Sequence, residues 1–291
     1  MNRRAFMAGA LACAALPATG AAPRFAHGLL WRIGKGRAAP SHVYGTMHVP
    51  DARLAELPAK AERAFEHAHS LMVEFLADGY TRERFLEAAL LPEGSTLEAL
   101  IGSEDFARAV ERLRPIGLAP ELVNRLKPWG VLLNLRDARR AEGVPVDTRL
   151  VEQAQLRRLP YSQIEGVEEQ IFTFDEFPLE SQVALLKHSL AHADELAELG
   201  ERTLAAYLAG DLAGIWSLRE RFAARFPELA PHQAIMNKRV IYDRSVVMAF
   251  RMQRELRRGA AFVALGALHL YGAKGVLALL EQDGYRTARV A

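Results

Sequence analysis

Short apolar runs bounded by turn residues predict β-strands near both ends of the chain. The clearest runs cover residues 29–33, 42–44, 71–75, 261–265 and 285–290. Two weaker candidates cover residues 144–146 and 161–164. The stretch "RIGKGRAAP" lacks a following helical pattern that could form a phosphate loop, so it predicts a hairpin turn between the first two strands.

Between residues 81 and 258 the apolar positions follow a helical period. Phe106, Val110 and Leu113 are one example, and prolines interrupt the pattern at several points. The sequence therefore predicts an α/β protein whose mixed central sheet comes from N- and C-terminal strands, with a large helical insertion at about 81–258. Because each terminal group of strands would be incomplete alone, we expect one domain over residues 23–291.

The first 22 residues have the layout of an export signal. Arg3 and Arg4 form a charged start, residues 6–16 are apolar, and small residues follow up to Ala22. The paired arginines fit a twin-arginine signal, and an ordinary secretory signal fits equally well. We expect cleavage after about Ala22 by the small-residue rule, and hence a periplasmic or secreted protein.

Cys13 is the only cysteine and lies inside this leader. Lipoprotein anchoring through Cys13 is the minor alternative, because Ala10 stands where a larger aliphatic residue is usual. The mature chain would contain no cysteine, which excludes disulfides and thiolate metal sites. No second long apolar run follows, so we expect no stable membrane insertion after removal of the signal.

The charge balance gives no reason to expect a nucleic-acid partner. The chain has 37 basic and 35 acidic side chains, a formal net charge of +2, without a long basic block. Half of the residues are hydrophobic, which is ordinary for a globular protein.

Two Gly-x-x-His turns follow two of the strands. Gly45 precedes His48, and Gly266 precedes His269. In open α/β sheets, ligands bind at the carboxyl ends of strands, where glycine lets the backbone approach them closely. Glu74 closes a third apolar run, and a charged group in such a run implies a cation, a hydrogen-bond network or a functional role.

Two imidazoles and a carboxylate are a plausible ligand set for a divalent metal. His48, His269 and Glu74 are therefore the candidate metal ligands and catalytic residues. Asp51, three residues after His48, is the candidate that orients its imidazole.

These motifs resemble the TraB/GumN family, which includes the Tiki metalloproteases and is related to erythromycin esterase-like and ChaN-like folds. The resemblance extends from about residue 28 to the end of the chain. It rests on "LLWRI", "HVYGTMHVPD", "MVEF", "LKPW", "GVPVDTRL", "IEGVEEQ" and the closing segment "FVALGALHLYGAKGVLALLEQDGYRTARV".

The resemblance implies a hydrolase or protease that depends on a divalent metal such as Mn, Co or Zn and acts on a peptide or protein. It places His48, His269 and Glu74 at the metal or catalytic centre. The family's arginine, in an Arg-Asn pair, matches Arg244, which suits an oxyanion or carboxylate clamp. Ser245 stands here in place of the asparagine.

Other histidines give weaker signals. His188 and His192 are one helical turn apart, a spacing that can bind zinc, but solvated histidines on a polar helix face are the better interpretation. For His67 and His69 we expect a loop or opposite strand faces. His27 and His232 suggest no site, and both Trp129 and Trp216 are expected in the core.

Three hypotheses on function stay open at this point. The first is an exported metal-dependent hydrolase acting on peptide bonds, in which Glu74 is a ligand or a general base. The second is a hydrolase without metal, in which a histidine activates water. The third is a non-catalytic periplasmic protein that binds a metal, haem or an envelope component.

Overall fold

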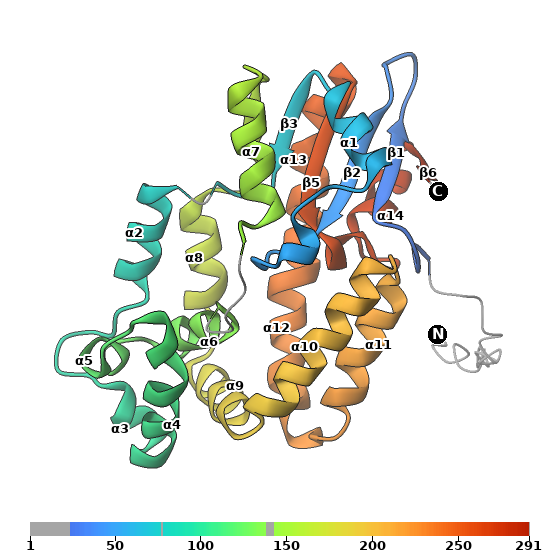
Figure 1. Ribbon diagram of the computed structural model, residues 1–291. Helices are drawn as coiled ribbons and strands as arrows, with labels where there is room; N and C mark the ends of the chain where they lie inside the picture. The colour runs from blue at the N-terminus through green and yellow to red at the C-terminus, as the bar shows by residue number, and fades with distance from the viewer. Residues whose placement is uncertain (1–23, 77, 138–142, 291) are drawn as a thin grey trace, which may run out of the picture.

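A computed structural model describes residues 24–76, 78–137 and 143–290 (Figure 1). The expected export signal and Cys13 lie outside these residues. The described strands form one six-stranded sheet in the order β4-β3-β5-β2-β1-β6. Their bounds are β1 (Leu30–Gly34), β2 (Ser41–Thr46), β3 (Ser70–Val73), β4 (Tyr161–Gln163), β5 (Ala261–Gly266) and β6 (Arg286–Arg289).

The sheet is mixed, as expected. The strands β4, β3, β5 and β2 are parallel neighbours, whereas β1 is antiparallel to both β2 and β6. The predicted hairpin joins β1 to β2, with Leu30 opposite Tyr44 and Ile33 opposite Ser41. The α/β class with strands from both ends of the chain is therefore confirmed.

Helices cover both faces of the sheet and extend beyond its carboxyl edge, where the arrow of β2 points towards α10–α12 (Figure 1). The first seven are α1 (Ala59–Glu66), α2 (Gly79–Ala88), α3 (Leu97–Ile101), α4 (Ser103–Leu113), α5 (Pro120–Val123), α6 (Pro128–Asp137) and α7 (Val146–Leu156). The others are α8 (Val167–Asp175), α9 (Leu179–Ala191), α10 (Ala193–Leu208), α11 (Leu212–Ala223), α12 (Ala230–Asn237), α13 (Arg244–Arg258) and α14 (Val276–Gln282).

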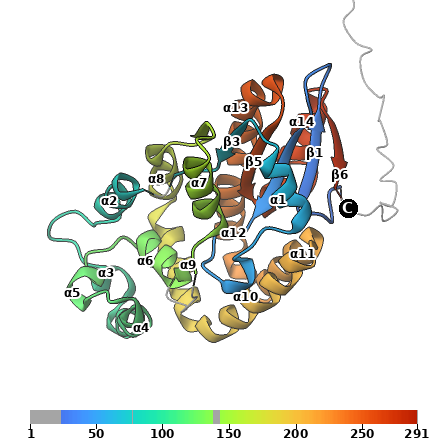
Figure 2. The same cartoon turned by 45° about the horizontal axis from the view of Figure 1, so that its top comes forward.

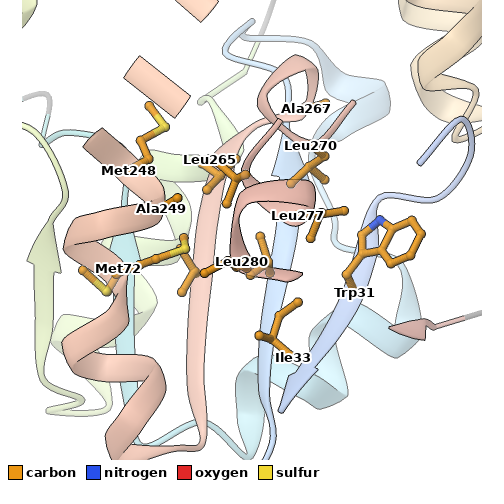
Figure 3. Close-up of a cluster of buried hydrophobic side chains, with 14 of the residues drawn as sticks. Trp31, Ile33, Met72, Met248, Ala249, Leu265, Ala267, Leu270, Leu277 and Leu280 are labelled. Atoms are coloured by element: carbon orange, nitrogen blue, oxygen red, sulfur yellow. The ribbon is translucent and has the colours of Figure 1, made fainter. Parts of the chain in front are cut away.

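The central strand β5 is buried on both faces, which explains its unbroken apolar sequence. On one face Leu265 belongs to a cluster with Met248 of α13 and Leu280 of α14 (Figure 3). On the other face Phe262 contacts the ring of Phe65 on α1, with a centroid distance of 5.4 Å. Each fully buried side chain of this size contributes about 1.5–3 kcal/mol, so both layers hold β5 in place.

The helical insertion has a core of its own. Helices α2 to α6 and α9 gather around buried side chains that include Leu97, Leu113, Trp129 and Leu186. This group lies to one side of the strands in both views (Figure 2). The weak strand prediction at 161–164 is confirmed as β4, so one strand lies inside the insertion.

Two expectations about the fold are wrong. Residues 144–146 form no strand, because α7 begins at Val146, directly after Pro145. Proline lacks the amide donor that a sheet requires, and its fixed φ suits the entry to a helix. Trp129 is buried, but Trp216 is only partly buried, and its indole N–H donates to Glu220 at 2.7 Å. That polar partner keeps Trp216 near the surface.

Gly45 in β2 allows the turn after β5 to lie against the strand. A Cβ on Gly45 would stand 2.8 Å from Leu270 Cδ1 and 3.0 Å from the Cα of Ala267. Gly45→Ala should therefore lower the free energy of unfolding by about 1–3 kcal/mol, measured by urea denaturation. Gly34→Ala is the matched control, because nothing lies within 4 Å of its Cβ position. Equal stability of the two variants would contradict the close packing.

Candidate functional site

Four neighbouring parallel strands end at one edge of the sheet, and a polar residue follows each of them. His48 follows β2, Glu74 follows β3, Glu165 follows β4 and His269 follows β5. The parallel pairings hold these strand ends beside one another. The structure thus brings both Gly-x-x-His turns and Glu74 to one place.

Gly266 lies at the centre of this group. The position of a Cβ on Gly266 is 3.3 Å from Glu74 Oε2, 3.3 Å from His48 Nε2 and 3.4 Å from His269 Cδ2. The Gly266 N–H also donates to Glu74 Oε2 at 2.9 Å. A side chain here would press against Glu74 and His48, and these groups would have to shift by a few tenths of an ångström to admit it.

His48 is held between two carboxylates. Its Nδ1 lies 2.8 Å from Asp147 Oδ2, and its Nε2 lies 3.1 Å from Glu74 Oε2. Thr46 Oγ1 donates to the other Asp147 oxygen at 2.9 Å. Burial alone would lower the pKa of His48, but the charges of Asp147 and Glu74 outweigh it and raise this pKa well above 6.5. His48 is therefore a cation in this arrangement.

Glu74 is 4% exposed, and both of its oxygens are hydrogen bonded. Arg244 Nη2 donates to Oε1, while the Gly266 N–H and His48 contact Oε2. Burial would raise the pKa of Glu74, but His48 and Arg244 together lower it well below its usual value. Glu74 is therefore a buried carboxylate whose charge its partners compensate.

Arg244 begins α13, directly after a π-helical turn at Lys238–Asp243, and it is 8% exposed. Its Nε and Nη2 donate to Glu165 at distances of 2.6 to 3.2 Å, and Nη2 also reaches Glu74. Burial raises the pKa of Glu165. The guanidinium is therefore an internal clamp between two carboxyl groups.

His269 lies in a 3₁₀ turn, Ala267–Leu270, and is neutral, because burial lowers its pKa to about 4. Its Nδ1 lies 2.9 Å from Ser245 Oγ, and that hydroxyl donates to the carbonyl of Ile241 at 2.7 Å. A serine has one proton to donate, so its oxygen accepts from Nδ1–H. This hydrogen bond leaves Nε2 of His269 unprotonated and available as a ligand or base.

Asp51 does not orient His48, contrary to the sequence-based expectation. Its carboxylate instead caps the turn at Ala52–Leu54 and pairs with Arg53 at 2.7 Å. The three-residue spacing from His48 to Asp51 gives no sign that Asp51 pairs with Arg53 instead. Asp147, at the first turn of α7, takes the orienting role.

The other histidines lie outside the site. His188 and His192 are not simply solvated, because their rings contact Phe226 with centroid distances of 4.4 and 4.6 Å, and His192 pairs with Glu195. His67 and His69 are exposed in the loop before β3, as expected.

Sequence reasoning assigned no role to Asp147 or Glu165, although "GVPVDTRL" and "IEGVEEQ" contain them. The position of Glu165 could have indicated its role. It directly follows the weak strand candidate at 161–164, as Glu74 follows the apolar residues 71–73. Nothing local could indicate Asp147, which lies 99 residues from the histidine that it contacts.

A model of the TraB/PrgY/gumN family matches residues 29–289 of the chain, which is nearly all of the described part. The chain belongs to the TraB/PrgY/gumN family. No solved structure matches it.

Curated relatives in this family carry two kinds of name. Metalloprotease TIKI2 of Danio rerio is 27% identical, covering 88% of this chain and 60% of its own length. Metalloprotease TIKI1 of Homo sapiens is 24% identical with the same coverage. Uncharacterized protein YbaP of Shigella flexneri is 27% identical, covering 80% of this chain and 84% of its own length. The chain therefore spans about 60% of the length of these TIKI relatives.

The word metalloprotease in the names of the TIKI relatives implies a metal in those proteins. In this chain, the imidazole and carboxylate donors of His48, His269 and Glu74 are of the kinds that bind divalent cations. Two histidines have Nδ1 held by Asp147 or Ser245, the usual support for ligands that bind through Nε2. Within the described ranges, however, no group of three or more His, Cys, Asp or Glu side chains is placed to hold a metal ion. Glu74 contacts His48 directly, so a cation would have to replace that hydrogen bond and the proton in it.

The two aspartates near His48 give a direct comparison. Asp147→Asn should lower the free energy of unfolding by about 1–3 kcal/mol, because it leaves the partly buried imidazolium of His48 without one charged partner. Asp51→Asn should change it by less than about 1 kcal/mol, since the pair with Arg53 is exposed and asparagine also caps helices. Chemical denaturation of both variants measures the difference, and a larger loss in Asp51→Asn would reverse the assignment.

Proposed function

We propose that this chain is a divalent-metal-dependent hydrolase that cleaves peptide bonds at the carboxyl edge of its sheet. The proposal is based on the convergence of His48, His269 and Glu74 on Gly266. The choice of peptide bonds is supported by the relatives named metalloproteases. YbaP, which is named uncharacterized, adds no substrate.

His48, His269 and Glu74 would hold the metal, whether Mn, Co or Zn. When bound, such a cation supplies a Lewis acid and lowers the pKa of water. The chain itself supplies orientation: Asp147 directs His48 through Nδ1, and Ser245 does the same for His269. Both imidazoles then present Nε2, the nitrogen that is free of these partners.

His48 and, after it, Arg244 keep Glu74 ionised inside the protein. A carboxylate that is 4% exposed would otherwise take up a proton, and a protonated carboxyl is a poor ligand and a poor base. The pairing thus makes Glu74 usable in either role. Arg244 is also close enough to the site to stabilise charge on a substrate carbonyl.

We also propose that the protein acts outside the cytoplasm, in the periplasm or as a secreted enzyme. This proposal depends on the leader at residues 1–22, with its arginine pair and apolar run. Among the described residues, no helix is both long enough and apolar enough to cross a membrane.

A second candidate is a hydrolase that needs no metal. The direct hydrogen bond between His48 and Glu74 favours it, because that contact occupies the atoms that a metal would need. His269, neutral with an unprotonated Nε2, would then act as the general base on water. Removal of metal separates the two candidates.

Metal content is the first test of the proposed function. After loading with Mn, Co and Zn in turn, the purified protein should retain about one metal per chain, as expected for one site with three protein ligands. His48→Ala and His269→Ala should lose it, measured by mass spectrometry of the elements. His69→Ala is the control, because His69 is exposed in a loop and should leave the metal content unchanged. Folded wild type without metal would contradict the proposal.

Peptide hydrolysis is the second test. Cleavage of a mixed peptide library should stop after treatment with a chelator and return with the metal that binds. Glu74→Gln should reduce kcat at least about 100-fold, because it removes the charge of a ligand or general base. Cleavage that survives complete removal of metal would instead favour the second candidate.

A further inference from the structure

The charge of Arg244 is compensated within the site. Glu165 accepts from Nε at 3.0 Å and from Nη2 at 2.6 Å, and Glu74 accepts from Nη2 as well. Glu165 is itself 4% exposed and receives a further hydrogen bond from Gln170 Nε2 at 2.8 Å. Two buried carboxyl groups and an amide therefore fix the plane of the guanidinium.

One nitrogen of this guanidinium stays available. In residues 24–76, 78–137 and 143–290, Nη1 of Arg244 makes no hydrogen bond. It is not enclosed, because the only enclosed side-chain nitrogen or oxygen atoms without a partner in these ranges belong to His188 and Tyr285. Nη1 is thus a donor that solvent reaches, in a side chain that is 9% exposed as a whole.

In the protein without a bound metal, the electrostatic surroundings of Nη1 are not those of an anion site. Three carboxyl groups, those of Glu74, Glu165 and Asp147, lie in one connected network with two cationic side chains, Arg244 and His48. Because the carboxyl groups outnumber the cationic side chains in this network, a phosphate or carboxylate ligand would add to an existing excess of negative charge. A neutral carbonyl oxygen accepts a hydrogen bond from Nη1 without that penalty.

We propose that Glu165 is a positioning residue that orients and neutralises Arg244, so that Nη1 donates to the carbonyl oxygen of an uncharged amide or ester. The metal-free site therefore excludes phosphate and sulfate. The kinetic part of this inference is based on the proposed function, whereas the exclusion of anions does not depend on it.

Glu165→Gln keeps the shape of the side chain and removes its charge. Glu168→Gln is the matched control, because Glu168 is exposed and, among the described residues, pairs only with Arg84, at 2.8 Å. The double variant Glu165→Gln/Arg244→Met removes both charges together and leaves Glu74 paired with His48, which avoids two unpaired buried carboxylates.

Binding of inorganic phosphate tests the exclusion of anions. The full-length proteins are freed of metal by a chelator, dialysed and titrated with phosphate by ³¹P NMR. Wild type and Glu168→Gln should not bind. Glu165→Gln should bind phosphate, with a dissociation constant at least about tenfold below the highest phosphate concentration at which wild type shows no binding, because one compensating charge is gone, and the double variant should lose this binding. Phosphate that binds wild type but not the double variant would overturn the proposal, as would Glu165→Gln without any gain.

Kinetics on a cleaved peptide test the positioning role. Glu165→Gln should lower kcat about 100-fold with little change in KM, because Arg244 loses the partner that holds Nη1 in position for the transition state. Glu168→Gln should match wild type. A change in KM alone, or equal rates for both variants, would overturn the positioning role. If wild type cleaves no peptide, the proposed function fails, and the phosphate titration still decides the exclusion of anions.

Discussion

A buried carboxylate must be compensated, and Glu74 imposes this requirement on every part of the site. Its oxygens contact Arg244 from α13, the Gly266 N–H at the end of β5 and His48 after β2. An ion left unpaired in the interior costs several kcal/mol, so these elements must keep their positions while Glu74 is ionised. The site is consequently part of what fixes α13 to the carboxyl edge of the sheet.

The two Gly-x-x-His turns are alike in sequence but present opposite forms of imidazole. His48 lies between two carboxylates and is a cation, whereas His269 has a hydroxyl at Nδ1 and is neutral. The difference comes from the charges of Asp147 and Glu74, which raise the pKa of His48, and from burial, which lowers the pKa of His269. Ser245 shows that the residue after Arg244 can orient His269 without the amide of an asparagine. The supporting side chains therefore decide which chemistry each turn can perform.

Local sequence patterns predicted most of the fold and part of the site. Apolar runs ending at glycine predicted β2 and β5, and a charge at the end of an apolar run made Glu74 conspicuous. Glu165 was missed because β4 is short and exposed, so its place beside β3 is set only by tertiary pairing. The prediction that Asp51 orients His48 was wrong because spacing along the chain cannot show that Asp51 pairs with Arg53.

The proposed hydrolysis depends on a cation that His48, His269 and Glu74 share beside Gly266. Anomalous diffraction from crystals of the manganese-loaded protein tests it directly. We expect one anomalous peak beside Gly266, in contact with Nε2 of both histidines and a Glu74 oxygen, with Asp147 still bonded to His48. Full manganese occupancy elsewhere, with the hydrogen bond between His48 and Glu74 intact, would contradict it.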